Sequence, residues 1–215
     1  MFNKGVPQIL NERDADPAVT TSVDLMETWS GMEDVFNGRL TRAIGLSNCN
    51  CKQLKRIYDC SKIKPCNLQI ECHLYMAQNK TVSFCKNHGV AVTAYAPLGK
   101  TSGAIPKLIG ERALGVRSSM ASHPLIDPAV VDLARRLHRT PAQVLLRYQV
   151  QRGLAVLTRS ENPDHIHENF KIFDFQLTPD QMSMLQGLDR NLRLFKHDRY
   201  DEVVQHPEFP FRSLF

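Results

Sequence analysis

Apolar residues recur along the first half of the chain with two spacings, one typical of helices and one of strands. Residues 23–37 carry an apolar stripe at helical spacing, which predicts a helix capped by Ser22 and ended by Gly38. Residues 50–60 and 77–88 predict two further helices. Short apolar or β-branched runs predict four strands, at residues 43–46, 67–71, 90–95 and 154–157.

Four helix starts in the second half of the chain share a local signature. A capping side chain stands directly before a proline at Asp127, Thr140, Asn162 and Thr178. Thr140 and Thr178 also have a glutamine three residues later, which completes a capping box. Residues 98–124 predict a long loop, and the chain after residue 190 predicts an irregular tail.

Strands and helices therefore alternate, and this order predicts an α/β fold with parallel strands. Several strands end on polar residues, namely Ser47 with Asn48, Glu71, Tyr95, and Thr158 with Arg159. Because ligands bind at the carboxyl edge of parallel sheets and barrels, we expect a binding site there. The sequence contains no GxGxxG, GxxxxGK[ST], GxSxG or HExxH motif.

Length and composition limit the class of protein. A chain of 215 residues with 42% apolar and 23% charged residues is typical of one globular domain. The net charge of +5 is spread along the chain, which disfavours nucleic-acid binding and suits an anionic cofactor. No apolar run approaches the roughly 18 residues that span a membrane. We expect no membrane segment and no signal peptide.

Six cysteines crowd one stretch of the chain, at positions 49, 51, 60, 66, 72 and 85. No CxxC pair and no regular Cys/His spacing accompanies them, so reduced structural thiols are favoured over a metal site. Reduced thiols predict a cytoplasmic location.

Five sequence blocks resemble the aldo-keto reductase family and follow the family's order. They are Asp24–Trp29, Ile44–Asn48, Gln69–His73, Ala94–Gly99 and Glu168–Phe175. The resemblance is to the C-terminal two-thirds of the family. It implies one NADP-dependent oxidoreductase domain over residues 1–215, folded as an incomplete (β/α)8 barrel of about strands 5–8. Residues 190–215 then correspond to a C-terminal substrate-loop tail.

The resemblance also implies a nicotinamide site at the strand ends. Ser47, Asn48 and Gln69 would hold the carboxamide, because Asn and Gln side chains both donate and accept hydrogen bonds. Tyr95 would stack on the nicotinamide ring. Without the family, Ser47 and Asn48 are equally typical of a turn after a strand, and Tyr95 of a half-buried strand end.

The phosphates and adenine of NADPH are assigned to two later segments. Leu98 begins the loop 98–103 over the pyrophosphate, with Lys100 as a candidate charge partner. The 2′-phosphate and adenine are assigned to the segment after the last strand, with Arg159, Ser160, Asn162, His165, Glu168 and Asn169 as contacts. His165 stands where the family usually has Arg, which predicts a retained but weakened preference for NADPH over NADH. The alternative is an ordinary capped helix with a solvated charge.

The family's catalytic Asp, Tyr, Lys and His have no counterpart in this sequence, so no catalytic residue is assigned. His73, Tyr75 and Tyr58 are conceivable proton donors, but packing or surface roles explain them better. Because a positioned acid contributes about 10²–10⁴-fold, we expect reduction of aldehydes and ketones to be impaired or absent. The alternative is a catalytically dead nucleotide-binding or interaction module.

Assembly and substrate are less constrained. Four strands leave two open barrel edges, which predicts a marginally stable half-barrel, a homodimer that completes the barrel, or no stable fold alone. The substrate would be a small carbonyl compound. The aromatic residues of the tail suit either a pocket wall or a docking contact, and they are Phe195, Tyr200, Phe209 and Phe211.

Overall fold

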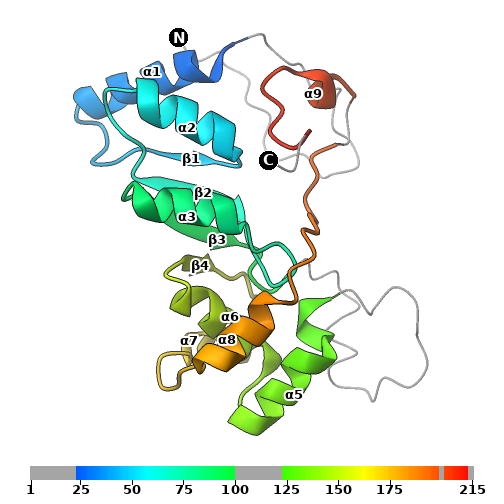
Figure 1. The fold of residues 1–215 in the computed structure, drawn as a ribbon. Helices are drawn as coiled ribbons and strands as arrows, with labels where there is room; N and C mark the ends of the chain where they lie inside the picture. The colour runs from blue at the N-terminus through cyan, green and yellow to red at the C-terminus, as the bar shows by residue number, and fades with distance from the viewer. Residues whose placement is uncertain (1–22, 100–122, 199–200, 213–215) are drawn as a thin grey trace.

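The computed structural model describes residues 23–99, 123–198 and 201–212 (Figure 1). In this part of the chain the strands are β1 (Gly45–Ser47), β2 (Asn67–Glu71), β3 (Ala91–Tyr95) and β4 (Ala155–Leu157). The helices are α1 (Leu25–Asn37), α2 (Cys51–Cys60), α3 (Asn79–Asn87), the 3-10 helix η1 (Pro124–Ile126), α5 (Pro128–Leu137), α6 (Pro141–Gln151), α7 (Pro163–Phe170), α8 (Pro179–Gln186) and α9 (Asp201–Gln205).

The described strands form one parallel sheet in the order β1-β2-β3-β4. Ser47 lies opposite Gln69 in the neighbouring strand, and Tyr95 lies opposite both Glu71 and Leu157. The parallel α/β class predicted from the alternation of elements is therefore confirmed. Within the described residues, β1 and β4 each pair on one side only.

The two faces of this sheet differ in burial. Leu68, Ile70 and Val92 are at most 3% exposed and pack in one apolar cluster with residues of α2 and α3. Gln69 and Thr93 point to the other face, because side chains alternate along a strand, and they are only half-buried. The face opposite the helices is therefore accessible beside the predicted carboxamide site.

A second apolar cluster fixes the helices that follow β3. Tyr75 of the β2–α3 loop is fully buried against Leu133 of α5, Leu145 of α6 and Leu185 of α8. The backbone N–H of Leu192 donates to the carbonyl of Tyr75 over 2.8 Å. The tail therefore leaves α8 beside the carboxyl end of β2.

Several predicted helix ends are confirmed, and the predicted start of the first helix is wrong. Thr140 and Thr178 form the predicted capping boxes with Gln143 and Gln181. The first helix starts at Leu25 rather than at residue 23, because the Asp24 carboxylate accepts from the N–H of Met26 and acts as the cap. Ser22 lies outside the described residues.

The tail is not wholly irregular. Residues Asp201–Gln205 form the short helix α9, which the sequence pattern did not predict. The segment is too short to show a helical apolar stripe. Its neighbours Pro210 and Glu208 are tied to α2 by hydrogen bonds from Asn50 and Gln53, so tertiary contacts hold this part of the tail.

The six cysteines are free thiols. No cluster of three or more candidate metal ligands occurs in the ranges that the structure describes. Cys60 and Cys66 are exposed, whereas Cys49, Cys72 and Cys85 are buried. Burial raises the pKa of Cys49 and of Cys85 to about 11. No helix in the described ranges has the length and apolar character needed to cross a membrane.

Alkylation of the native protein at pH 8 is expected to separate the two exposed cysteines from the three buried ones. Cys60 and Cys66 should react at the rate of a free thiol, while Cys49, Cys72 and Cys85 should react only after denaturant is added. The reason is that the thiolate is the nucleophile, and burial suppresses both its formation and access to it. Peptide mass spectrometry after timed alkylation measures the rates. Protection of Cys60 and Cys66 that a chelator removes would contradict the assignment of free thiols.

Candidate functional site at the strand ends

The first part of the candidate site is built around Asn48. Asn48 follows β1 with a φ of 56°, a left-handed conformation that asparagine tolerates better than most residues. Its backbone N–H donates to the carbonyl of Gln69 over 2.9 Å. The hydroxyl of Tyr95 donates to its Oδ1 over 2.9 Å. The side chain is therefore held in one orientation, and no residue in the described part of the chain accepts a hydrogen bond from its Nδ2 group.

Ser47 and Gln69 lie beside this hydrogen bond. They are opposite one another in the β1–β2 register, so their side chains share the half-exposed face of the sheet. Tyr95 ends the next strand along. The structure therefore brings Ser47, Asn48 and Tyr95 to the ends of β1 and β3, with Gln69 inside β2 between them.

The Tyr95 ring is held on more than one side. Burial and the nearby Glu71 carboxylate raise the pKa of Tyr95 to about 12. The ring of Phe195, from the tail, meets it edge-on at a centroid distance of 5.7 Å and an angle of 76°. Tyr95 therefore stays protonated at neutral pH and offers an uncharged aromatic surface rather than an acid.

The second part of the candidate site follows β4. Arg159 is 89% exposed and pairs with the equally exposed Glu161 over 2.9 Å. Ser160 accepts a hydrogen bond from the N–H of Asn162, whose own side chain caps α7. Exposed ion pairs contribute little, so an incoming phosphate can replace Glu161 as the partner of Arg159.

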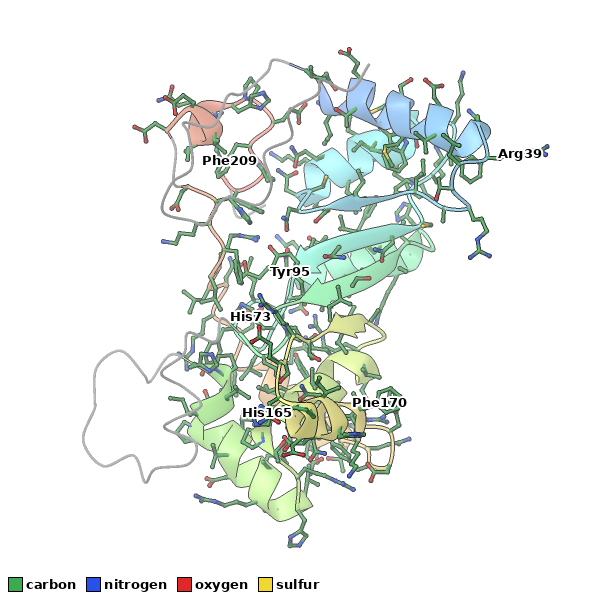
Figure 2. All side chains as sticks on the ribbon, turned by 180° about the vertical axis from the view of Figure 1, so that it is seen from behind. Arg39, His73, Tyr95, His165, Phe170 and Phe209 are labelled. Carbon is green, nitrogen blue, oxygen red and sulfur yellow. The ribbon has the colours of Figure 1, made fainter. Side chains whose placement is uncertain are left out.

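Three predicted adenine-end residues have different surroundings. Asn169 lines a hollow of about 550 Å³ together with Arg159, Ser160 and Phe173. His165 is exposed on α7 (Figure 2). The Glu168 carboxylate accepts from the hydroxyl of Thr140 over 2.6 Å and so ties α7 to the start of α6. In this structure that oxygen therefore already has a partner within the fold.

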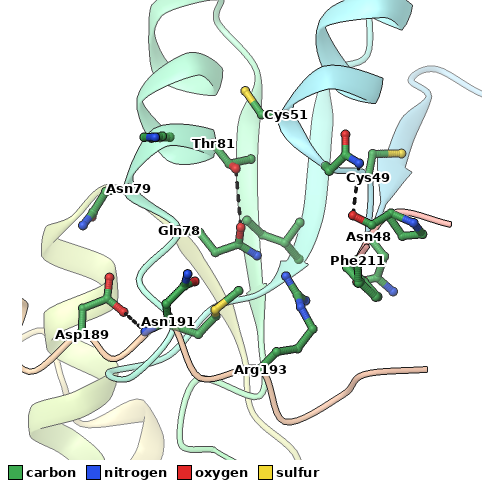
Figure 3. Close-up of a pocket in the computed structure, with 15 residues that line it drawn as sticks. Asn48, Cys49, Cys51, Gln78, Asn79, Thr81, Asp189, Asn191, Arg193 and Phe211 are labelled. Carbon is green, nitrogen blue, oxygen red and sulfur yellow. Dashed lines mark hydrogen bonds between the residues drawn. The ribbon is translucent and has the colours of Figure 1, made fainter. Parts of the chain in front are cut away.

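The two parts meet at adjacent strands but open into separate hollows. Tyr95 and Leu157 are opposite one another, and Arg159 comes two residues later. A hollow of about 440 Å³ has Asn48 in its wall and lies between the starts of α2 and α3 and the tail (Figure 3). Arg159 belongs to the other hollow.

Leu98 and the adjoining loop complete the predicted residues. Leu98 is half-buried and packs against the apolar cluster of α5 and α6. Lys100 and the rest of the loop to residue 122 lie outside the described residues, as does Tyr200.

The conceivable proton donors have other partners. Tyr75 donates to Asp127 over 2.6 Å in the core, and burial together with this bond raises its pKa. The hydroxyl of Tyr58 donates to the carbonyl of His88 on the helical side of the sheet. His73 is fully buried against Glu71 at 2.9 Å. These contacts explain all three residues without a catalytic role.

Sequence reasoning missed the role of Glu71, which it treated only as a polar strand end. The side chain is fully buried and accepts hydrogen bonds from the backbone of Leu194 and Phe195. A carboxylate that closes an apolar strand was the available signal, because a buried charge requires partners. The partners themselves, more than 120 residues later, had no signal.

Comparison with known proteins gives one family. The family model described as "Aldo/keto reductase family" matches residues 14–190. Prostaglandin F synthase 1 of Bos taurus is 39% identical over 213 residues, which is 97% of this chain and 60% of that protein. Aldo-keto reductase family 1 member C3 of Homo sapiens is 38% identical over 191 residues, covering 88% of this chain and 55% of the relative.

A solved structure gives the same result. The aldose reductase from Schistosoma japonicum superposes with a TM-score of 0.74 at 36% identity, over 90% of this chain and 56% of that one. The chain thus spans about 60% of the length of the curated relatives that it matches.

Proposed function

The chain belongs to the aldo/keto reductase family, and we propose that it binds NADPH across the carboxyl ends of its parallel strands. The observation that carries the proposal is the hydrogen bond from Tyr95 to Asn48, whose backbone N–H donates to the carbonyl of Gln69 in β2. This hydrogen bond fixes an amide group beside an aromatic ring. The amide suits the carboxamide of a nicotinamide, and the aromatic ring suits its pyridine ring. The family's reaction, the reduction of aldehydes and ketones, would depend on this binding step.

The fit to the nicotinamide rests on unused polar groups. The Nδ2 group of Asn48 can donate to the carboxamide oxygen, and Gln69 and Ser47 can complete its hydrogen bonds. The neutral Tyr95 ring can stack on the nicotinamide, and this fixes which face of the ring is presented. Bound NADPH would supply the hydride, so these residues orient rather than transfer protons.

The fit to the 2′-phosphate rests on Arg159. Its guanidinium can form a bidentate contact, and the start of α7 directs N–H groups of the same region toward an anion. Glu161 opposes the phosphate and His165 replaces a fixed positive charge, so the preference for NADPH over NADH should be modest. The half-exposed Asn169 and the apolar wall of its hollow suit the adenine.

We propose that the 215-residue chain binds the cofactor without reducing carbonyl compounds by itself. The described tyrosines and His73 are engaged in packing contacts, and Tyr95 has a pKa of about 12. Its substrate class, small aldehydes and ketones, comes from the family. Relatives carry the names prostaglandin F synthase and dihydrodiol dehydrogenase, and neither substrate is assigned to this chain.

Two measurements on one preparation test this proposal. Quenching or transfer of protein fluorescence on adding NADPH and NADH should give saturable binding that is tighter for NADPH. NADPH absorbance with a generic aldehyde should then show no turnover above the buffer rate. Absent NADPH binding, or tighter NADH binding, overturns the cofactor assignment. Clear turnover overturns the inactive state alone.

We also propose that the chain forms an open segment of the barrel and that a second copy closes it. Among the described residues β4 pairs on one side only, and the side chain of Leu157 in this edge strand is 50% exposed. A second copy can place its own β1 there in parallel, which would give the eight strands that a barrel requires. Backbone pairing along this edge together with burial of Leu157 would favour the dimer.

The Leu157→Lys variant is expected to convert this dimer into a monomer, because a charge would be placed at the new strand pair. Sedimentation velocity measures the change. Ser183→Lys, on the exposed surface of α8, adds the same charge elsewhere and should leave the dimer intact. A wild-type chain that sediments as a monomer at every soluble concentration would refute the dimer.

A cytoplasmic location, proposed from the six free thiols, is testable with a fluorescent fusion.

A further inference from the structure

The tail segment 190–198 crosses the carboxyl ends of β2 and β3 (Figure 2). The backbone of this segment contacts a buried carboxylate there. This carboxylate is Glu71, the last residue of β2, and its side chain is fully buried. An ionised carboxylate in such a place is costly unless several donors surround it. The donors present show what the residue does.

Both oxygens of Glu71 are engaged, and the tail provides most of the donors. Oε1 accepts from the N–H of Leu194 over 2.6 Å and lies 2.9 Å from Nε2 of His73. Oε2 accepts from the N–H of Phe195 over 3.1 Å and lies 3.5 Å from the guanidinium of Arg193. Three consecutive tail residues therefore converge on one carboxylate.

The ionised form of Glu71 is the one that fits this arrangement. Burial alone would raise the pKa of the Glu71 carboxyl. The hydrogen bonds from His73, Leu194 and Phe195 together lower it by more, so the pKa lies below its usual value. A neutral amide at the same place would offer one acceptor oxygen, and its NH2 group would face donors. The tail contact therefore requires a carboxylate.

The clamp reaches the candidate cofactor site through one ring. Phe195 is bonded to Glu71 by its backbone, and its ring lies edge-on against Tyr95. Tyr95 in turn donates to Asn48. A tail released from Glu71 would remove the aromatic contact that braces the Tyr95 ring.

The far part of the tail has a separate attachment. Glu208 accepts from Gln53 and pairs with Arg56, both on α2. Arg193 lies over the ring of Phe211 at 3.9 Å, at the wall of the hollow that contains Asn48 (Figure 3). Glu208 therefore provides a matched control, since its loss should free the far tail without releasing Phe195.

We infer that Glu71 is a positioning residue, whose buried carboxylate clamps Leu194 and Phe195 so that the Phe195 ring holds Tyr95 in place for the cofactor. The last step rests on the proposed NADPH binding, whereas the clamp itself does not. Glu71 would act through Phe195 and Tyr95 without touching the dinucleotide.

The test compares Glu71→Gln with Glu208→Gln in the full chain. Hydrogen exchange should show the Leu194 and Phe195 amides losing protection at least tenfold in Glu71→Gln and keeping it in Glu208→Gln. A carbon-13 NMR titration of tyrosine should show the pKa of Tyr95 falling from about 12 toward 10 in Glu71→Gln but not in Glu208→Gln. Phe195→Ala keeps the Glu71 charge and should also lower the pKa of Tyr95, because the ring loses the burial that Phe195 provides, whereas a change confined to Glu71→Gln would report only the lost charge.

The second part of the test measures the affinity for NADPH. Glu71→Gln and Phe195→Ala should each weaken NADPH binding several-fold, and Phe195→Ala should do so with the Leu194 amide still protected. Retained protection and an unchanged Tyr95 titration in Glu71→Gln would overturn the clamp. Unchanged NADPH affinity in both variants would overturn the positioning role. A wild-type chain that fails to bind NADPH would refute the positioning role and the proposed function together, while the exchange and titration results would still decide the clamp.

Discussion

The Arg159→Gln variant is expected to bind NADPH about tenfold more weakly than the wild type and to bind NADH with unchanged affinity. A hydrogen bond to a charged group contributes about 1.5–3 kcal/mol, and the exposure of Arg159 places this contact at the lower end. NADH lacks the 2′-phosphate, so its affinity should not change. Titrating both cofactors into both proteins measures the ratio.

Two controls make this prediction specific. Arg135→Gln removes an exposed arginine from α5, where it pairs with Asp132, and should change neither affinity. Raising the salt concentration should weaken NADPH binding more in the wild type than in Arg159→Gln, because the lost contact is an exposed ionic one. Equal losses for NADPH and NADH would place Arg159 away from the phosphate.

The Gly45→Ala variant is expected to lower the free energy of unfolding by about 1–3 kcal/mol, the usual cost of overpacking. A Cβ at Gly45 would lie 2.7 Å from the carbonyl oxygen of Asn67, in the strand to which β1 is paired. Backbone cannot move aside there without disturbing the β1–β2 ladder. Urea unfolding, read as the midpoint at constant slope, measures the change.

Gly31→Ala is the matched control for this variant. Gly31 lies within α1, and a Cβ there would have no neighbour within 4 Å. Alanine in a helix is about 0.5–1 kcal/mol more favourable than glycine, so this variant should be more stable than the wild type. Opposite signs for the two glycines are the expected result. A neutral Gly45→Ala would indicate that β1 does not pair with β2 as described.

Local chemistry made most elements predictable from the sequence. The proline-led helix starts at Pro141 and Pro179 have the predicted caps, because these motifs act within four residues. The strand Asn67–Glu71 has the bounds that its apolar pattern predicts. The start of α1 and the helix α9 were missed, since Asp24 competes with Ser22 as a cap and α9 is too short to show a helical apolar stripe.

The candidate site was predictable only in part. The end of each strand could be recognised, so the neighbourhood of Asn48, Gln69 and Tyr95 followed from parallel pairing. The contact between Glu168 and Thr140 could not be predicted, because it joins helices 28 residues apart by side chains alone. The Glu71 clamp spans 123 residues to Leu194, and no local pattern records such a pairing.

A crystal structure of the 215-residue chain with NADP+ would decide whether these strand ends form a cofactor site. We expect the nicotinamide carboxamide beside Asn48 and Gln69, its ring against Tyr95, and the 2′-phosphate at Arg159. A dinucleotide bound away from these four side chains, or bound with its phosphate far from Arg159, would contradict the proposed site.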